Sequence, residues 1–348
     1  MKICHVNLSR RFSGRERQTL LLIKQQLREG YKITVVARHQ SQFAQEVGKL
    51  PCQLILTRSN LMKQSAKLHK DYELVHAHED HAAQWAYMQC KRYNTPFIIT
   101  CRADKPVSNK YLLLKTYQKA KALVGISHKI VRNLEAQFKT KRCIRIPSSP
   151  ISYPVNQNKV DQIWSAHAYK TLVLQASYLG QQKGFDTSIE AAKLLENEKT
   201  PVHFLFLGSG PEKENLKKQA SGLSNVFFMS KQEDMGTWFA SANMLIHPSK
   251  SEGLGSVILE AMAAGLPTIA SNTGGIPDII EHEQTGLLIE PDNATELAAA
   301  IERLTQDQAL RNQLQAAAKD KLSDFDIQES TRLYLKLYKE VVDASSHE

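Results

Sequence analysis

Short apolar runs alternate with amphipathic segments along almost the whole of this 348-residue chain. A short apolar run indicates a buried strand, whereas apolar residues repeating at helical spacing indicate a helix packed on a sheet. In the first half, the runs predict strands at Lys2–Leu8, Ile33–Ala37, Gln53–Thr57, Glu73–His78, Pro96–Cys101, Ala122–Ser127 and Cys143–Pro147. In the second half, they predict strands at Thr171–Ala176, Val202–Leu207, Val226–Met229, Met244–His247, Pro267–Ser271 and Gly286–Glu290. Strands that alternate with helices in this way predict parallel α/β sheets.

A stretch rich in proline and serine, Pro147–Asn158, interrupts this alternation and has no periodicity of its own. Such a segment is typical of a domain boundary. We therefore expect a first domain at residues 1–150, a linker at 151–158 and a second domain at 159–326. The remaining residues, 327–348, contain an amphipathic helical pattern, and we expect this helix to pack back on the first domain.

Two glycine-rich turns stand close together between His247 and Glu283. The first, Gly253–Ser256, opens a predicted helix at Val257–Ala264, and the second is Asn272–Gly275. The amino end of a helix binds anions well, because unpaired N–H groups and the helix dipole both point outward there. The two turns therefore indicate a pocket for a phosphorylated and hydroxylated ligand, although ordinary strand-to-helix connections produce the same pattern.

The charge of the chain is divided unevenly. Residues 1–158 contain 28 lysines and arginines and 9 acidic residues (28 − 9 = +19), whereas the rest contains 17 and 26 (17 − 26 = −9). A basic first half indicates an anionic partner, and nucleic acid, an anionic membrane surface and a phosphorylated acceptor all satisfy that description.

The cysteines and the apolar runs indicate a cytoplasmic protein. The five cysteines are odd in number and form no C-x-x-C pair, which favours free thiols in a reducing compartment. No apolar run approaches the roughly 20 residues that span a bilayer, and the first ten residues are too polar for a signal peptide.

One histidine pair, His76 and His78, raises the question of a metal site. Neighbours at i and i+2 share one face of a strand, but no third ligand with zinc-site spacing is evident. We therefore expect no metal here, and we interpret the pair as a polar pocket wall or a structural feature.

The predicted helix at residues 110–121 carries lysines and tyrosines around a leucine core. Such a helix can lie on an anionic membrane interface through Lys110, Lys115 and Lys119. A solvated helix whose leucines pack on the sheet is the alternative.

Four motifs in a fixed order give the chain a resemblance to a known family. They are K-G-F-D at Lys183–Asp186, E-x7-E at Glu252 and Glu260, E-A-M-A-A-G-L-P from Glu260, and G-G-I-P-D-I-I from Gly274. Together they resemble the GT-B-fold retaining glycosyltransferases of family 4, also called glycosyl transferases group 1, across essentially the whole chain. The resemblance implies two Rossmann-like, doubly wound parallel-sheet domains facing a cleft. It also implies that the second domain binds a nucleotide-sugar donor and that no cofactor or metal is needed.

The resemblance assigns donor-binding roles by motif position. Glu260 would accept hydrogen bonds from the ribose hydroxyls, Glu252 would hold the sugar hydroxyls, and Lys183 would stabilise the departing diphosphate. The N–H groups that would meet the sugar and diphosphate belong to Leu254, Gly255, Ser256 and Val257. The remaining positions implied at the donor are Gly14, Ser177, Gly208 and Gly210.

The chain departs from the family pattern near Arg102. Many members have a histidine after the fourth or fifth strand, whereas this chain has Thr100–Asp104, T-C-R-A-D. Arginine cannot act as a base at neutral pH, so Arg102 could only bind anions or orient the substrate. A second departure is Ser177, or its neighbour Tyr178, where an arginine often precedes the lysine loop. The T-C-R-A-D-x-P run resembles members that build the core of bacterial lipopolysaccharide.

These observations predict a retaining, metal-independent glycosyltransferase with Lys183, Glu252 and Arg102 in the active site. We expect a UDP- or ADP-sugar as donor and an anionic, lipid-linked acceptor of the lipopolysaccharide core. The protein would be cytoplasmic and peripheral at the inner face of the cytoplasmic membrane, and no nucleic acid is expected as a partner. The alternatives are an exopolysaccharide or small sugar phosphate as acceptor, or a non-catalytic basic protein that binds membranes or nucleic acid.

Overall fold

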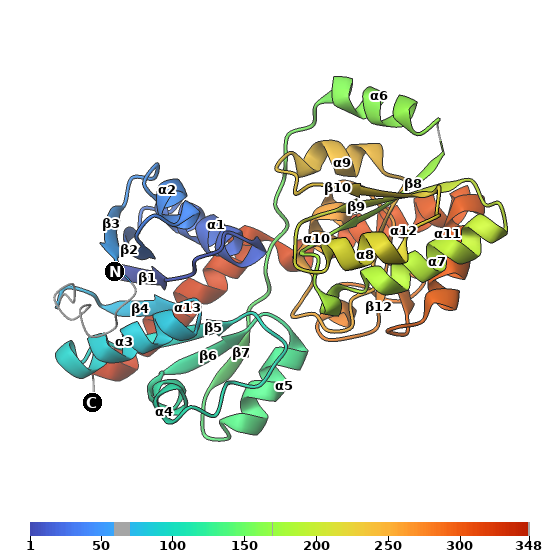
Figure 1. The fold of residues 1–348 in the computed structure, drawn as a ribbon. Helices are drawn as coiled ribbons and strands as arrows, with labels where there is room; N and C mark the ends of the chain where they lie inside the picture. Colours follow the sequence, from blue (N-terminus) through green and yellow to red (C-terminus); the bar gives the residue numbers. More distant parts are fainter. Residues whose placement is uncertain (59–69, 169, 347–348) are drawn as a thin grey trace. The chain divides into compact units, whose positions relative to one another are not determined.

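The computed structural model describes residues 1–58, 70–168 and 170–346, and the chain forms two compact units in it (Figure 1). Unit 1 contains Met1–Ser149 and Phe325–Glu348, and unit 2 contains Pro150–Asp324. Each unit has one parallel sheet with helices packed against it. The two doubly wound α/β sheets predicted from the alternation of apolar runs are confirmed.

The sheet of unit 1 changes direction between β1 and β4. Its seven strands are ordered β3-β2-β1-β4-β5-β6-β7. Their bounds are β1 Lys2–Asn7, β2 Lys32–Arg38, β3 Gln53–Thr57, β4 Leu74–Ala77, β5 Phe97–Cys101, β6 Ala122–Gly125 and β7 Cys143–Arg145. The chain builds outward from β1 in one direction and then from β4 in the other. The loops after these two strands therefore diverge, which leaves an opening at their carboxyl ends.

Three helices of unit 1 begin after a residue whose side chain caps the first turn. Ser41, Glu79 and Ser127 each accept hydrogen bonds from backbone N–H groups of the first turn that follows them. The bounds are α1 Gly14–Arg28, α2 Gln42–Val47, α3 Asp80–Tyr93, α4 Tyr111–Lys119, α5 His128–Gln137 and α13 Ile327–Ser346.

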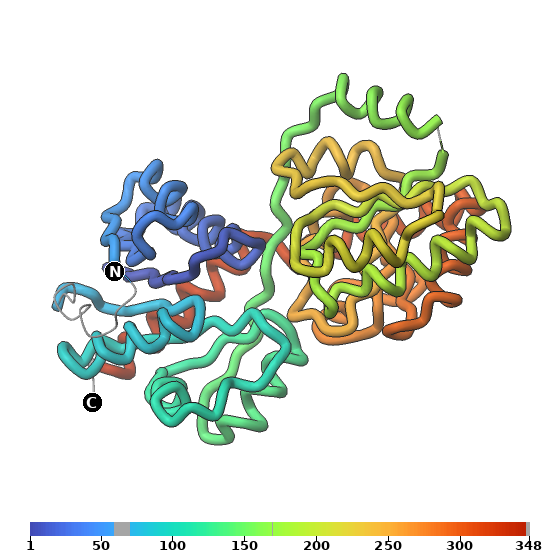
Figure 2. The backbone as a smooth tube through the Cα atoms, in the orientation of Figure 1, coloured from blue at the N-terminus to red at the C-terminus, as the bar shows by residue number. Residues whose placement is uncertain are grey.

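The last helix, α13, completes the core of unit 1. It packs against α1, and the backbone returns to unit 1 with this segment, drawn in red in Figure 2. The hydroxyl of Tyr338 lies 2.6 Å from Nδ1 of His76 and 3.3 Å from Nε2 of Gln26. The hydroxyl of Tyr334 lies 3.0 Å from Oγ1 of Thr100. All of these side chains are buried, so α13 contributes both apolar surface and polar partners to the interior.

The sheet of unit 2 has the same plan with six strands. The order is β10-β9-β8-β11-β12-β13, so the reversal lies between β8 and β11. The bounds are β8 Thr171–Ala176, β9 Val202–Leu207, β10 Val226–Met229, β11 Met244–His247, β12 Thr268–Ser271 and β13 Leu287–Ile289. Phe204 and Phe206 on β9 pack with Phe185 in the core, because strands covered on both faces are apolar throughout.

The helices of unit 2 include one that the sequence did not predict as structured. α6 begins at Gln157, so the last two residues of the predicted linker, 157–158, are helical. The helical bounds are α6 Gln157–Ala166, η3 Gln181–Lys183, α7 Phe185–Asn197, α8 Lys213–Gln219, α9 Met235–Ser241, α10 Ser256–Ala263, η4 Ile276–Asp278, α11 Ala294–Gln306, α12 Gln308–Lys321 and, at the boundary with α13, η5 Leu322–Phe325.

Across residues 1–58, 70–168 and 170–346, no helix is both long and apolar enough to span a membrane. All five cysteines of the chain are free thiols, as their spacing predicts.

The hydroxyl of Tyr338 provides a test of the packing of α13. In Tyr338→Phe, the buried Nδ1 of His76 loses its partner, and we expect a loss of about 1–3 kcal/mol in the free energy of unfolding. Tyr111→Phe is the matched control, because Tyr111 is 77% exposed. Urea denaturation of both variants measures the difference. Equal stability of the two variants would show that the buried hydroxyl contributes nothing.

Candidate active site

The loops that leave β8 and β11 meet at the reversal point of the unit 2 sheet. β8 pairs with β11 in parallel, and both strands end at the same edge. Open α/β sheets bind ligands at this position, outside the carboxyl ends of the strands. The lysine loop at 177–184 follows β8, and the glycine turn at 253–255 follows β11.

The lysine loop is held in place by its backbone. Gly184 has φ of +68°, and a Cβ atom there would lie 1.8 Å from the carbonyl oxygen of Pro248. Only glycine fits this approach between the two loops. The carbonyl of Lys183 accepts a 2.8 Å hydrogen bond from Nε2 of Gln175 in β8. These contacts fix the point from which the Lys183 side chain projects.

Lys183 and Glu252 form an ion pair across the two loops. The Nζ atom of Lys183 lies 2.5 Å from Oε2 of Glu252, and Nε2 of His247 lies 2.8 Å from the same oxygen. Burial by itself would raise the pKa of Glu252. The hydrogen bond from His247 and the charge of Lys183 nevertheless hold that pKa well below its ordinary value of 4.5. Glu252 is therefore a carboxylate, whose other oxygen accepts a 3.1 Å hydrogen bond from N–H of Gly253.

The backbone of Glu252 is fixed by the second glycine turn. Its carbonyl accepts a 3.0 Å hydrogen bond from N–H of Gly275. A Cβ atom on Gly274, which has φ of +60°, would lie 1.9 Å from that carbonyl oxygen. The two glycine turns predicted from the sequence thus contact each other directly, and they form one structural unit around Glu252.

Helix α10 begins beside this unit. Gly255 is its amino-terminal cap with φ of +92°, and Ser256 and Val257 are its first residues. Leu254 is buried, and Glu260 lies on the helix with 8% of its surface exposed. The two glutamates of the E-x7-E motif are therefore placed differently, one in the loop and one on the helix.

Gly208 and Gly210 lie where the loop after β9 crosses the loop after β8. Cβ atoms on these glycines would lie 2.0 Å from the carbonyl oxygen of Ser177 and 2.1 Å from that of Leu179. The structure thus brings Ser177, Gly208 and Gly210 together through backbone contacts that exclude any side chain at the two glycines.

A second ion-pair cluster connects the loop of Lys183 with the loop of Glu252. Nζ of Lys250 lies 2.8 Å from Oδ2 of Asp186 and 2.6 Å from Oδ1 of Asp292. These hydrogen bonds raise the pKa of Lys250. The backbone N–H of Lys250 donates to the carbonyl of Gln182, so the cluster ties the lysine loop to the loop of Glu252.

Sequence reasoning missed the roles of His247, Ser249 and Lys250. His247 ends β11 with 1% of its side chain exposed, and Oγ of Ser249 lies 3.0 Å from its Nε2. The available signal was the run H-P-S-K-S-E, in which a histidine at a strand end precedes a glutamate by five residues.

Five of the predicted site residues belong to unit 1, namely Gly14, Arg102, Lys110, Lys115 and Lys119. Gly14 is the first residue of α1. Arg102 follows β5 and lines a cavity of about 600 Å³ in this unit. Its Nε is buried and, among the described residues, has no hydrogen-bond partner. Lys110, Lys115 and Lys119 lie at exposed positions before and along α4.

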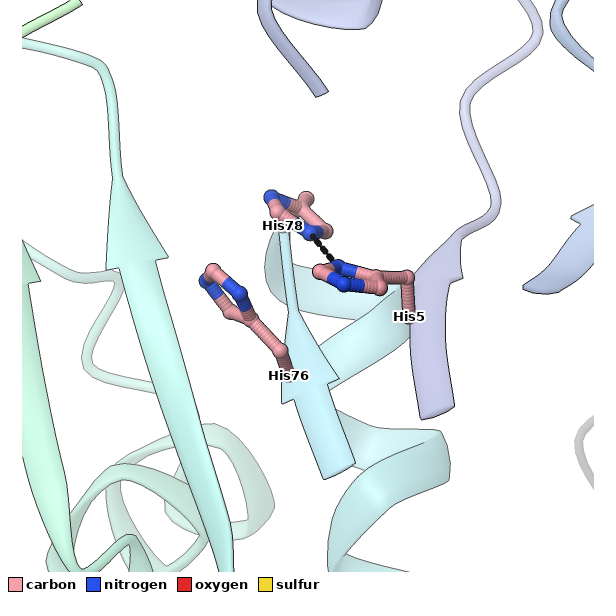
Figure 3. A group of neighbouring side chains, drawn as sticks. All are labelled: His5, His76 and His78. Atoms are coloured by element: carbon pink, nitrogen blue, oxygen red, sulfur yellow. Dashed lines mark hydrogen bonds between the residues drawn. The ribbon is translucent and has the colours of Figure 1, made fainter. Parts of the chain in front are cut away.

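Three histidines meet inside unit 1, as Figure 3 shows. His5 on β1 pairs in register with His76 on β4, and His78 follows that strand. One ring nitrogen from each lies within 4.8 Å of the others, a spacing that could admit a metal ion. Five of the six ring nitrogens already have hydrogen-bond partners within the described chain, so an ion would have to replace those bonds. The expectation that no metal binds here stays a prediction.

Comparison with known sequences identifies the family. Residues 156–321 match the sequence model of glycosyl transferases group 1, and residues 12–148 match that of glycosyltransferase family 4. The chain belongs to this family of glycosyltransferases, as its motifs predict.

The curated relatives match part of the chain. Sulfoquinovosyl transferase SQD2 of Arabidopsis thaliana is 34% identical over 166 residues, which cover 47% of this chain and 32% of that protein. The lipopolysaccharide core biosynthesis glycosyltransferase LpsE of Rhizobium meliloti is 31% identical over 170 residues, which cover 48% and 49%. The match thus spans less than half the length of either relative.

Solved structures establish the fold. The structure of HepE (Alr3699) from Anabaena in complex with UDP and glucose has a TM-score of 0.82 and 19% sequence identity. The likeness covers 97% of this chain and 99% of that chain. The GT-B fold predicted from the motifs is confirmed.

Gly184 tests how the lysine loop is held. In Gly184→Ala, both the left-handed backbone and the contact with Pro248 oppose the new methyl group. Gly222→Ala is the matched control, because Gly222 has φ of +90° but nothing within 4 Å. The backbone effect costs about 1–2 kcal/mol in each variant, so we expect a clearly lower melting temperature for Gly184→Ala in thermal unfolding. Equal melting temperatures would contradict the close approach of the two loops.

Proposed function

We propose that this chain transfers a sugar from a nucleotide-sugar donor to an anionic, lipid-linked acceptor of the lipopolysaccharide core. The observation that carries the donor half of this proposal is the ion pair of Lys183 and Glu252 beside the amino end of α10. One cation, one carboxylate and a set of backbone N–H groups are the partners that a sugar diphosphate requires.

In this proposal each part of the donor has its own partner in unit 2. Lys183 binds the diphosphate, and the N–H groups from Leu254 to Val257 meet the phosphate and sugar oxygens. Glu252 binds sugar hydroxyls, and Glu260 accepts hydrogen bonds from the ribose. The base packs beside the loop of Gly208 and Gly210. The UDP and glucose in the HepE complex support a nucleotide-sugar donor, and we propose a UDP- or ADP-sugar.

The chemistry follows from the leaving group. A departing diphosphate needs charge neutralisation more than a general acid, and Lys183 with the dipole of α10 supplies it without a metal. We propose retention of the anomeric configuration, with the acceptor attacking from the face that the diphosphate leaves and the diphosphate taking the acceptor proton. Glu252 is not the nucleophile in this scheme, because the acceptor itself attacks from the face that the diphosphate leaves.

The proposed acceptor is based on the charge of the first half of the chain and on the exposed residues of α4. The first 158 residues carry a formal charge of +19 (28 − 9), and LpsE, a relative, is named for lipopolysaccharide core biosynthesis. On α4, Tyr111 and Leu112 are exposed beside Lys110 and Lys115. Exposed apolar groups flanked by lysines suit an anionic membrane interface. We therefore propose a cytoplasmic protein that is peripheral at the inner face of the cytoplasmic membrane.

Lys183→Ala and Glu260→Ala test the donor site. We expect each to abolish the thermal stabilisation by the nucleotide sugar that binds the parent, identified by screening UDP-, ADP-, GDP- and CMP-sugars. We expect Lys183→Ala to reduce the rate of transfer or donor hydrolysis about 10²–10³-fold, because the departing charge loses a fixed partner.

Lys193→Ala is the matched control for Lys183→Ala. Lys193 lies on α7 and pairs only with its helical neighbour Glu190 among the described residues. The donor assignment is wrong if both site variants keep the activity and ligand response of this control.

The lysines of α4 test the membrane surface. Replacing Lys110, Lys115 and Lys119 with glutamate should abolish co-sedimentation with anionic vesicles at low salt, since each lysine contributes about 1 kcal/mol near such a surface. The control replaces three lysines of α8, namely Lys213, Lys217 and Lys218. Vesicle binding that survives the α4 change, or that is lost equally in the control, would exclude α4 as the contact.

A further inference from the structure

Unit 1 has a cavity at the reversal point of its own sheet. The cavity of about 600 Å³ is lined by residues from the loops after β1 and β4, including Arg10 and His78. These are the two adjacent strands whose loops diverge, which is where a parallel α/β sheet binds its ligand. The cavity lies entirely within unit 1 and none of the donor residues in unit 2 line it.

Positive charge dominates the walls of this cavity. The lining cations are Arg10, Arg11, Arg15, Arg38, Arg58, Arg102 and Lys105. The side chains of four of them, Arg10, Arg15, Arg38 and Lys105, make no hydrogen bond or ion pair with any residue that the structure describes. An arginine cluster without internal partners is typical of a phosphate site, because guanidinium groups bind two oxygens of a phosphate at once.

The three carboxylates in the cavity wall are already engaged. Glu16 accepts from N–H and Oγ of Ser13 at 2.8 and 2.7 Å. Glu79 accepts from backbone N–H groups at the start of α3, and Asp80 accepts from the hydroxyl of Tyr117 at 2.8 Å. None of the three forms an ion pair with a lining arginine or lysine within the described residues. The side chains of Arg10, Arg15, Arg38 and Lys105 are therefore left to a ligand.

A chain of hydrogen bonds fixes the state of His78. Oε1 of Gln26 lies 2.7 Å from Nε2 of His5, so this nitrogen carries the proton. Nδ1 of His5 is then an acceptor, and Nε2 of His78, 2.9 Å away, must donate to it (Figure 3). Burial lowers the pKa of both histidines, which keeps both rings neutral. Nδ1 of His78 is consequently an unprotonated acceptor.

That acceptor has no partner among the residues that the structure describes. His78 lines the cavity with 4% of its surface exposed, and its buried Nδ1 makes no hydrogen bond with any described residue. Leaving such an atom unsatisfied costs about 1–3 kcal/mol. A hydroxyl group that reached this nitrogen from the cavity would satisfy it.

We infer that the cavity of unit 1 binds a phosphorylated sugar, with the phosphate on the unpaired arginines and Lys105 and a sugar hydroxyl donating to Nδ1 of His78. His5 and Gln26 are positioning residues, because they hold His78 in the accepting tautomer. This inference rests on the proposed function in one respect: the phosphorylated sugar is the acceptor part of the substrate. The phosphate and the hydroxyl together orient that sugar.

Calorimetric titration of the full chain tests the inference. The probes are glucose 6-phosphate, glucose and inorganic phosphate. We expect glucose 6-phosphate to bind more tightly than either of the others. Arg38→Gln should weaken it about ten- to hundredfold, as the loss of one charged hydrogen-bonding group does, whereas Arg132→Gln, an exposed arginine on α5, should not. Equal binding of phosphate and glucose 6-phosphate would overturn the sugar assignment.

His78 variants separate its hydrogen bond from its packing. His78→Leu should bind glucose 6-phosphate no better than inorganic phosphate. His78→Asn keeps an acceptor oxygen near the position of Nδ1 and should restore part of the preference. Nitrogen NMR of the parent gives a readout independent of mutation: His78 should be protonated at Nε2, and its Nδ1 resonance should shift when glucose 6-phosphate binds. Protonation at Nδ1 would overturn the assignment.

Two further titrations identify the origin of any failure. UDP binding should be lost in Lys183→Ala and kept in Arg38→Gln. If UDP binds and glucose 6-phosphate does not, the cavity inference alone fails, whereas the reverse result contradicts the proposed donor site. Loss of UDP binding in Arg38→Gln would assign the cavity to the donor diphosphate and overturn the inference. A further probe is phosphatidylcholine vesicles that contain phosphatidic acid. If the protein binds these vesicles and not glucose 6-phosphate, the phosphate belongs to a lipid headgroup, and the inference is overturned.

Discussion

Each unit of this protein is organised by the single place where its strand order reverses. Loops that leave β1 and β4 in unit 1, or β8 and β11 in unit 2, turn away from each other and leave a crevice at the carboxyl ends of the strands. The polar chemistry of both units gathers there. Unit 2 presents one lysine and one carboxylate, which neutralise each other, whereas unit 1 presents a cluster of cations whose neighbouring carboxylates are engaged elsewhere.

The glycines of unit 2 matter because they lack a side chain, not because they make the backbone flexible. Gly184 and Gly274 lie where a neighbouring carbonyl approaches to less than 2 Å of the place a Cβ would occupy. Their role is to let three loops touch, so that Lys183 and Glu252 are held by backbone contacts on both sides. Because the backbone around Lys183 and Glu252 is already ordered, a ligand has only to exchange the ion pair of their side chains, which favours binding.

The fold could be predicted from the sequence because buried parallel strands are continuous apolar runs. The runs at Gln53–Thr57 and Thr171–Ala176 became strands with the same bounds. Helix α6 was missed because it follows a proline-rich stretch and has few buried residues. Contacts between residues far apart in the sequence could not be predicted either. His5 and His78 are 73 positions apart and meet only through the register of β1 with β4, and Lys183 and Glu252 are 69 apart.

The position of α13 also dictates the order in which the protein can fold during synthesis. Domains usually form from the amino terminus as the chain emerges from the ribosome. Here the partners of His76 and Thr100 are Tyr338 and Tyr334, which are made after the whole of unit 2. Unit 2, whose residues 150–324 are contiguous, has its whole sequence available first. The amino-terminal sheet must therefore wait for α13, and Nδ1 of His76 lacks its partner Tyr338 until unit 2 has been made.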